Sequence, residues 1–488
     1  MTSPTASPRS SERERAYRAV LARDVRFDGR LFVGVRTTGV FCRPICRART
    51  PRLENVDFYA SAAAAQEAGF RPCLLCRPES SPDVAAWRGS SATVSRALVL
   101  IGEGALDDSS VESLASRLGM GERQLRRLFD KHLGTSPVAV AQSRRVLFAK
   151  KLVHETALSM TEIAHASGFG SVRRFNEAFA LAMGRAPTSL RRAGGKSAKA
   201  ARGTTLTLGY VPPLEWSQFV AFFRARALPG VEHVDETGYT RTIAFGDQIG
   251  TIHVAPAPGK HALALTVRFP DVTRLPTIVA RVRRMFDLDA DVAAIGRVLR
   301  RDPALRARLR ARPGLRVPGA WDPFESAIRA ILGQQVSVAR AGQLAGVIIE
   351  RWGAPVVTDH AALTRVFPSA TVLADVLPET RLGMPGARVK ALATLAREAA
   401  TNGALFSPST SIEDARSTLR GLSGIGSWTE EYVALRALRD PDGFPASDVG
   451  ILRALEVNGE RPTAEDVAER AEAWRPFRAY AAQHLWWE

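Results

Sequence analysis

Two cysteine pairs account for all four cysteines of this 488-residue chain, and both pairs lie within its first 80 residues. They read Cys42-Arg-Pro-Ile-Cys46 and Cys73-Leu-Leu-Cys76. Pairs at this spacing are typical of a tetrahedral zinc site, whereas two disulfides or unrelated buried thiols are the alternatives. The first 20 residues are rich in Ser, Pro and Arg and contain no apolar run, so we expect a reducing compartment and a cytoplasmic, nucleoid-associated protein. The sequence therefore predicts Zn²⁺ bound by all four cysteines.

Arginine-rich segments surround both pairs, at residues 35–49, 52–59 and 68–78. Over about residues 13–80 this pattern resembles the zinc domain of the Ada family, which senses methylated DNA. The resemblance implies that Cys42 accepts a methyl group from a DNA methylphosphotriester in a single turnover, and that Cys46, Cys73 and Cys76 complete the zinc site. We expect the nearby cations to attract phosphate. They are Arg36, Arg43, Arg47, Arg49, Arg71 and Arg77.

Length and charge predict several domains and a nucleic-acid partner. At about 100–200 residues a domain, the chain holds three or four domains. The net charge of +18 is uneven: residues 1–202 hold 33 Lys and Arg against 18 Asp and Glu, and the remainder holds 34 against 31. A basic half implies a polyanion such as double-stranded DNA. No apolar run approaches the ~20 residues of a membrane span, so we expect no membrane partner.

An internal repeat with helical patterning lies at about 92–192. Each unit, 111–129 and 161–179, is predicted to form two helices joined by a glycine turn at Gly119 or Gly168. The second helix of each unit carries side chains suited to DNA contacts: Arg123, Gln124, Arg126, Arg127, Arg173 and Arg174. Ordinary solvated charges are the alternative, but two copies in the basic half favour DNA. The stretch resembles the double helix-turn-helix domain of AraC-type activators, which implies promoter DNA and RNA polymerase as partners.

After residue 203 the pattern of apolar residues changes from helical to strand-like. Strands are predicted at about 206–208, 239–245, 250–254 and 263–269, with covering helices at 215–227 and 274–286, so this part is an α+β unit. From about 287 onward almost every segment has helical periodicity.

A glycine turn before a helix is the clearest chemical motif of the helical part. Gly424-Ile-Gly426 exposes backbone amides that can seat a phosphate, and Ser427 and Glu430 have the spacing of a capping box. Such a turn is most often only a turn. Here Asp448 follows and stands at the start of a new helix. Most aspartates at the start of a helix are N-caps. A cap and a catalytic role are compatible, because the helix dipole favours a carboxylate there.

Residues 204–488 resemble AlkA-type 3-methyladenine glycosylases of the helix-hairpin-helix superfamily. The hairpin and the segments 313–319, 324–338, 382–385 and 484–487 carry the resemblance. It implies that Asp448 is catalytic, that Trp428, Tyr432 and Trp486 line a base pocket, and that Gly424 and Gly426 bind DNA. Gln335 stands where the enterobacterial enzyme wedges a leucine into the duplex, so it is a further expected DNA contact.

Composition predicts simple hydrolysis of the N-glycosidic bond. Strand-cutting relatives carry a lysine in the hairpin, where this chain has Trp428, and Lys390 is the one lysine after Lys260. No cysteine follows Cys76, which excludes an iron–sulfur cluster and the O6-methylguanine transferase of other Ada proteins. Asp448 would stabilise an oxocarbenium-like sugar or activate water, while aromatic walls stack on an electron-poor base such as 3-methyladenine.

The expected fold class is therefore multidomain. The predicted parts are a small zinc-bound α+β domain (1–82), an all-α double helix-turn-helix domain (90–193), a linker (194–203), an α+β AlkA-type N-terminal domain (204–286) and an all-α helix-hairpin-helix glycosylase domain (287–488). The predicted function is methyl capture and transcriptional activation joined to base excision repair, in a monomer. The alternative is a DNA-binding regulator with structural zinc and an inactive glycosylase fold.

Overall fold

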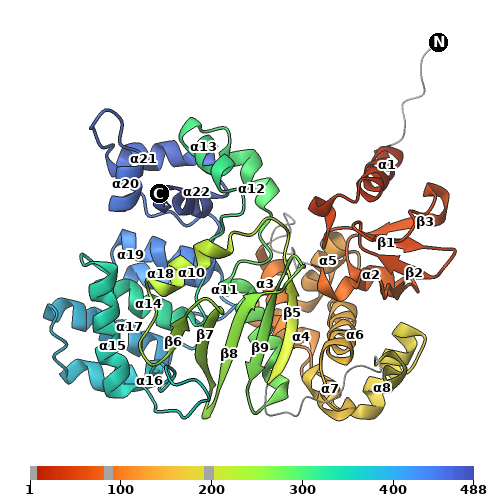
Figure 1. Ribbon diagram of the computed structural model, residues 1–488, viewed down its shortest axis with the longest axis horizontal. Helices are drawn as coiled ribbons and strands as arrows, with labels where there is room; N and C mark the ends of the chain where they lie inside the picture. The colour runs from red at the N-terminus through yellow and green to blue at the C-terminus, as the bar shows by residue number, and fades with distance from the viewer. Residues whose placement is uncertain (1–7, 82–91, 192–202, 488) are drawn as a thin grey trace. The chain divides into compact units, whose positions relative to one another are not determined.

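The computed structural model describes residues 8–81, 92–191 and 203–487 (Figure 1). The predicted linker at 194–203 lies outside the described residues except for Gly203. The chain divides into two compact units, one of Met1–Val211 with Asp271–Ile278 and the other of Pro212–Pro270 with Val279–Glu488. Within the described residues, no helix is both long and apolar enough to cross a membrane.

A small sheet with short helices forms the N-terminal part of the first unit. Its strands are β1 (Phe32–Val35), β2 (Val40–Cys42), β3 (Val56–Tyr59) and β4 (Arg71–Pro72), in the order β3-β1-β2-β4. The helices are α1 (Pro8–Leu21) and α2 (Ala62–Glu67), with short 3₁₀ turns at Val25–Phe27, Leu53–Asn55 and Pro78–Ser80. Phe32, Phe41, Ala65 and Phe70 pack into its core. β2 pairs antiparallel with β1 and parallel with β4, and this pairing brings the two cysteine pairs together.

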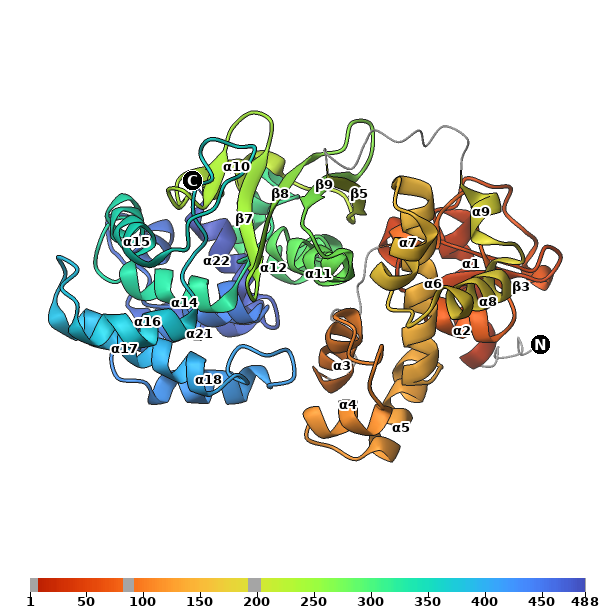
Figure 2. The same ribbon diagram turned by 90° about the horizontal axis from the view of Figure 1, so that it is seen from below.

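The repeat predicted from the sequence is present as two helix pairs around one long helix. The elements are α3 (Ala92–Gly102), α4 (Val111–Arg117), α5 (Glu122–Leu133), α6 (Pro137–Glu155), α7 (Met160–Ala166), α8 (Val172–Met183) and α9 (Pro187–Leu190). Gly119 and Gly168 have φ of +74° and +81°, so both turns need the left-handed conformation that glycine adopts readily. Figure 2 shows α6 with α4 and α5 near one end and α7 and α8 along its other part.

A buried ion pair joins the cysteine-bearing segment to α6. The side chain of Lys150 is fully buried, and its Nζ donates to the Cys73 carbonyl at 3.0 Å and to Glu79 Oε2 at 2.6 Å. Ser61 Oγ also donates to the Leu133 carbonyl at 2.9 Å. The cysteine-bearing part and the helical repeat are therefore packed as one body within the first unit.

Replacing Glu79 with glutamine should destabilise the first unit by about 3–5 kcal/mol, because the buried Lys150 ammonium loses the carboxylate that neutralises it. Hydrogen exchange of the α6 amides, followed by mass spectrometry on the full chain, measures this loss. Glu122→Gln is the matched control, since Glu122 pairs with Arg126 on the surface and such a pair contributes about 1 kcal/mol or less. Equal protection of α6 in both variants would contradict the prediction.

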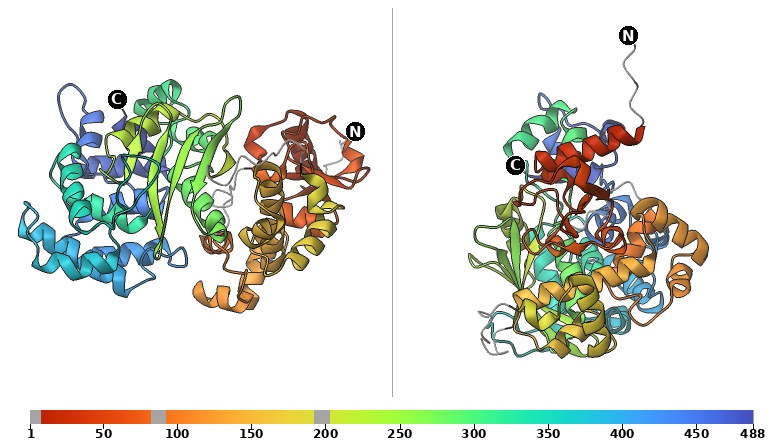
Figure 3. Two further views of the ribbon diagram at one scale, coloured as in Figure 1. Left: turned by 60° about the horizontal axis from the view of Figure 1, so that its bottom comes forward. Right: turned by 90° about the vertical axis from the view of Figure 1, so that its right-hand side faces the viewer.

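The second unit combines an antiparallel sheet with a large helical part. Strands β6 (Glu232–Val234), β7 (Tyr239–Phe245), β8 (Gln248–Pro256) and β9 (Ala262–Arg268) pair in sequence order. The predicted strands are confirmed at β7, β8 and β9 of this unit, and the first predicted strand is confirmed at β5 (Thr204–Gly209), which belongs to the first unit. The sequence did not predict β6, which is short and contains the buried Glu232. The left view of Figure 3 shows the green strands side by side next to the blue helices.

The helices of this region follow the predicted periodicity. They are α10 (Trp216–Arg224), α11 (Leu275–Met285), α12 (Val292–Leu299), α13 (Pro303–Ala311), α14 (Pro323–Leu332), α15 (Val338–Trp352), α16 (Ala370–Val376), α17 (Gly386–Thr401), α18 (Ile412–Gly421), α19 (Ser427–Val433), α20 (Val449–Ala454), α21 (Ala464–Ala471) and α22 (Arg478–Trp486). Short turns lie at Val272–Arg274, Leu377–Glu379 and Glu472–Trp474, and a π-helical turn at Ala434–Leu438. Ile328 and Ile331 of α14 and Leu392 of α17 are among the residues of the main core. This core supports α14, α19 and the loops that frame the candidate pocket.

Candidate functional site

The four cysteine sulfurs form a compact cluster at the β2 and β4 ends. Cys42 closes β2 and the Cys73 amide donates to the Phe41 carbonyl, while a turn brings the Cys46 amide to the Arg43 carbonyl. The sulfurs all lie within 4.8 Å of one another. A tetrahedral zinc site with Zn–S bonds of about 2.3 Å has S–S edges of about 3.8 Å. The donor set therefore fits zinc, which would neutralise thiolates that otherwise repel one another.

Half of the arginines expected to attract phosphate are engaged within the protein. Arg43 pairs with the buried Asp28, donates to the Cys76 carbonyl, and its backbone amide donates to Cys76 Sγ at 3.3 Å. Arg77 pairs with Glu79 and Glu155, and Arg36 pairs with Asp57. The Arg43 and Arg77 pairs are partly or largely buried and join separate segments of the fold, whereas the Arg36 pair lies at the surface.

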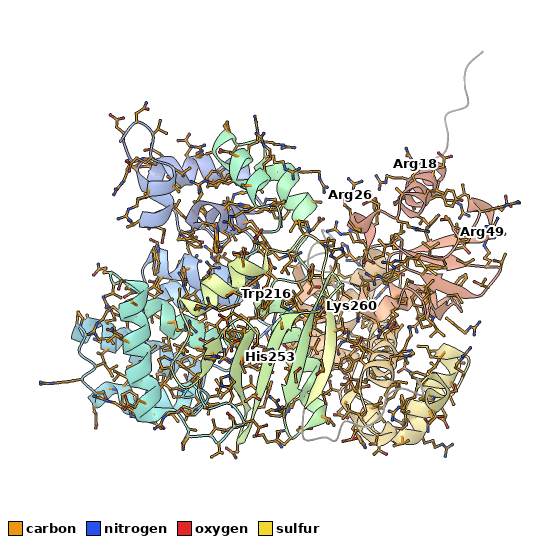
Figure 4. The ribbon with its side chains drawn as sticks, in the orientation of Figure 1. Arg18, Arg26, Arg49, Trp216, His253 and Lys260 are labelled. Carbon is orange, nitrogen blue, oxygen red and sulfur yellow. The ribbon has the colours of Figure 1, made fainter. Side chains whose placement is uncertain are left out.

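The remaining arginines of that set are exposed. Arg47, Arg49 and Arg71 are all accessible, and Figure 4 shows Arg49 pointing away from the ribbon of the cysteine-bearing part. Arg36 is exposed as well, so these three and Arg36 are the cations of the set that a phosphate can reach.

The expected helix-turn-helix contacts all lie at exposed positions of α5 and α8: Arg123, Gln124, Arg126, Arg127, Arg173 and Arg174. Leu125 and Phe129 of α5 are buried on the opposite side, and Phe175 and Phe179 are buried in α8. Arg126 pairs with Glu122, and Arg173 with Glu177, each one helical turn away. Contact of these side chains with DNA remains a prediction.

A cavity of about 490 Å³ lies in the second unit, and its lining contains all the aromatic residues expected in a base pocket. Trp428 and Tyr432 are one turn apart on α19, so their rings stack with centroids 5.1 Å apart and planes 16° apart. Trp486, at the end of α22, lies 6.1 Å from Tyr432 between ring centroids. Their use as a base pocket remains a prediction.

Asp448 lies at the same cavity and caps α20, as the sequence suggested. Its Oδ1 accepts from the amides of Gly450 at 2.9 Å and Ile451 at 3.2 Å. Trp486 Nε1 donates to Oδ1 at 2.7 Å, and Trp428 Nε1 donates to Oδ2 at 2.8 Å. Four N–H groups therefore fix the carboxylate between two pocket tryptophans.

The glycine turn has one sterically required glycine. Gly424 has φ of +89°, and a Cβ there would lie 2.5 Å from the Ala391 Cβ. Gly426 is the N-cap of α19, and a Cβ added there would meet no atom within 4 Å, so sterics do not require this second glycine. The predicted capping box is wrong: Ser427 is already helical and makes no cap, and the Glu430 side chain pairs with Arg416 at 2.7 Å.

Gln335 is exposed at the turn between α14 and α15, with φ of +54°. The preceding Gln334 donates from Nε2 to the Gly424 carbonyl at 3.0 Å and to Thr429 Oγ1 at 2.9 Å. This turn is thus tied to the glycine turn. Sequence reasoning missed Gln334, and no pattern marks it, because its bonds join segments about ninety residues apart.

Arg436 is a second residue that the sequence analysis missed. It is only 5% exposed, and its guanidinium lies over the rings of Phe222, Tyr432 and Trp486 at 4.6, 5.6 and 5.0 Å from their centroids. A signal was present, since an arginine within the apolar helical run Val433-Ala-Leu-Arg-Ala-Leu438 is unusual.

Three family models match successive parts of the chain. They are the "Metal binding domain of Ada" over residues 15–79, a "Helix-turn-helix domain" over residues 114–193 and the "AlkA N-terminal domain" over residues 205–322. These matches confirm the predicted multidomain fold class. With the four-cysteine cluster, they also confirm zinc as the metal.

Known proteins resemble the chain over nearly its full length and over its C-terminal part. The "DNA-3-methyladenine glycosylase 2" of Escherichia coli is 34% identical, over 58% of this chain and 96% of that protein. The solved "3-methyladenine dna-glycosylase from Archaeoglobus fulgidus" has a TM-score of 0.50 at 24% identity, covering 57% of this chain and 96% of that one, which shows a shared fold. The "Probable bifunctional transcriptional activator/DNA repair enzyme AlkA" of Mycobacterium tuberculosis is 41% identical over 97% of this chain and 96% of that protein. The chain belongs to this family of bifunctional activator/DNA repair AlkA proteins.

Proposed function

We propose that this protein captures methyl groups from DNA methylphosphotriesters, activates transcription, and excises alkylated bases such as 3-methyladenine. The observation that carries the excision activity is the carboxylate of Asp448, fixed by Trp428 and Trp486 at the edge of an aromatic cavity. The four-cysteine cluster and the match to the metal binding domain of Ada support methyl capture.

In the proposed methyl transfer, Cys42 Sγ attacks the methyl carbon of the phosphotriester. A C–S bond forms, the C–O bond breaks, and its electron pair restores the phosphodiester anion. Bound zinc supplies the positive charge that keeps the cysteines deprotonated at neutral pH. The product is a thioether, and no later step removes its methyl group. Each protein molecule therefore accepts one methyl group.

In the proposed base excision, the target nucleotide leaves the duplex and its base enters the aromatic cavity. The C1′–N bond breaks and its electron pair goes to the base. Asp448 stabilises the positive sugar and directs the water, whose oxygen bonds to C1′ while one of its protons passes to solvent. The products are a free base and an intact abasic strand, since the hairpin position that would need a lysine for strand cleavage holds Trp428.

An inactive glycosylase fold with structural zinc is the alternative function. The intact Asp448 and its four donors favour activity, because capping α20 uses only the two amides and does not require the two tryptophan N–H groups that hold the carboxylate at the cavity. Incubation of the full chain with methylated duplex DNA, followed by chromatography of released bases, decides between them: free 3-methyladenine supports the enzyme, and its absence supports the regulator.

DNA binding by the basic half should weaken steeply with salt, because each phosphate contact releases a counterion. Arg127→Ala is expected to reduce the slope of log K against log salt by about 1, and so is Arg174→Ala. Titrations of promoter DNA at several salt concentrations measure the slopes. Arg224→Ala, an exposed arginine of α10 in the less basic part, is the control with an unchanged slope. Unchanged slopes in the first two variants would exclude α5 and α8 as the DNA-binding helices.

We infer a cytoplasmic, nucleoid-associated monomer that contacts double-stranded DNA and, as an activator, RNA polymerase. The proposed domains are those given by the sequence patterns: 1–82, 90–193, 204–286 and 287–488, with a linker at 194–203. The family matches at 15–79, 114–193 and 205–322 support this order.

A further inference from the structure

A buried arginine shares the wall of the cavity with the aromatic residues. Arg436 lines the cavity together with Asp448 and contacts the face of Trp486, whose Nε1 donates to Asp448. The cavity therefore has an acid at the Nε1 edge of one indole ring and a cation over the face of the same ring. Aromatic rings and an acid alone would favour a positively charged base, whereas a guanidinium opposes one.

The guanidinium keeps its charge and has no carboxylate partner among the described residues. Burial lowers the pKa of Arg436 to about 10, so the group is still protonated at neutral pH. Its Nη1 donates to the Pro318 carbonyl at 3.0 Å, but its Nε is buried without a hydrogen-bond partner. A buried, unsatisfied donor on a charged group costs stability, so its position at the wall of a cavity marks it as a candidate functional group.

The cationic character of the wall extends beyond this one residue. Arg226 also lines the cavity. Its guanidinium lies 4.3 Å from the centroid of the Phe222 ring, which Arg436 contacts as well. Burial raises the pKa of the Tyr432 phenol, but the charges of Arg436, Arg226 and Arg329 and a hydrogen bond with Arg436 together lower it below its usual value. The two guanidiniums thus set a positive potential beside Tyr432, where the base is proposed to stack.

Positive potential at that place acts differently on two kinds of leaving group. A methylated purine that already carries a positive charge leaves as a neutral base and needs no help from a cation. An uncharged purine lesion leaves with an additional electron pair and develops negative charge as the bond breaks. A fixed cation near that charge lowers the barrier for the second kind alone.

Resting on the proposed glycosylase activity, we propose that Arg436 determines substrate range by stabilising the departing base when that base is an uncharged purine lesion. In this step the C1′–N bond breaks and its electron pair stays on the base, which leaves as an anion paired with the guanidinium. The oxygen of water bonds to C1′ and its proton passes to solvent. Water then protonates the base, and Arg436 keeps its own proton throughout.

The test compares one cationic and one uncharged base in the same enzyme. Single-turnover excision by the full chain is measured on duplexes that contain either 7-methylguanine or hypoxanthine. Arg436→Gln removes the charge but can still donate to the Pro318 carbonyl, and Arg436→Lys keeps a charge. Arg461→Met is the control, because Arg461 is exposed, pairs with Glu456 and does not line the cavity.

For Arg436→Gln we expect hypoxanthine release to fall on the order of 10²-fold, with 7-methylguanine release within about 3-fold of the unmutated protein. Arg436→Lys should recover hypoxanthine release to within about 10-fold, and Arg461→Met should change neither rate. An equal loss on both bases would show that Arg436 only supports the fold and would overturn the proposal. Excision of 7-methylguanine but not hypoxanthine by the unmutated protein would also overturn it, while leaving the proposed glycosylase intact.

Failure to excise either of these bases, and also 3-methyladenine in the same assay, would instead refute the glycosylase proposal itself. If Arg436→Gln does not fold, as judged by circular dichroism and thermal melting, Arg436→Met provides the uncharged side chain, with the same expected ratio of the two rates. A ratio unchanged in that variant would overturn the proposal.

Discussion

Asp448→Asn should lower the release of 3-methyladenine on the order of 10²–10³-fold while DNA affinity stays close to that of the unmutated protein. The asparagine can still cap α20 and accept from Gly450 and Ile451, but it lacks the negative charge that stabilises the positive sugar. Single-turnover rates on DNA that contains 3-methyladenine measure the first effect, and titration of an abasic duplex measures the second. The unmutated enzyme should also give no borohydride-trapped adduct with DNA.

The control for this variant is Asp322→Asn. Asp322 caps α14 through the Glu325 amide at 3.0 Å, so it has the same structural role without pocket tryptophans. Its excision rate should be near normal. Near-normal excision by Asp448→Asn, or an equal loss in both variants, would show that Asp448 acts only as a helix cap.

Cys42→Ala should abolish methyl transfer from methylphosphotriester DNA and the tighter DNA binding that follows it. Four thiolates and one Zn²⁺ carry a formal charge of −2, and conversion of Cys42 to a thioether changes it to −1, which reduces repulsion of phosphate. Peptide mass spectrometry of the unmutated protein should find the methyl group on Cys42. A methyl group on another cysteine would contradict the assignment.

Zinc loss and loss of the nucleophile have to be separated, because Cys42 is also a ligand. Cys42→His supplies an imidazole ligand without a thiolate, so it should retain zinc yet transfer no methyl group. Cys46→Ala, Cys73→Ala and Cys76→Ala should lower zinc content and unfold the cysteine-bearing part, since zinc binding contributes about 10–16 kcal/mol in small zinc domains. Zinc content and methyl transfer measured on the same samples distinguish the two effects.

The sequence predicted those features that depend on residue type at fixed local spacing. The zinc ligands were evident because the metal requires four sulfurs in two close pairs. The two glycine turns of the helical repeat were evident because only glycine adopts their positive φ without strain. Asp448 was correctly expected to cap a helix, since its oxygens bind amides two and three residues ahead.

Features that depend on contacts between distant segments were not predictable in this way. The capping box at Ser427 failed because Glu430 is drawn to Arg416, which belongs to the preceding helix. Arg43 and Arg77 looked available for phosphate, but their carboxylate partners come from other elements. The bond from Gln334 to the glycine turn likewise joins segments that no local pattern connects.

The most direct test of the central claim, two chemistries on one chain, is a single experiment with two readouts. Full-length protein is incubated with DNA that carries both isotopically labelled methylphosphotriesters and 3-methyladenine, and methyl on protein and free base are quantified together. The unmutated protein should give both products. Asp448→Asn should give labelled protein with little free base. Cys42→His should give free base without labelled protein. Loss of both products in either variant, or absence of one product in the unmutated protein, would contradict the account.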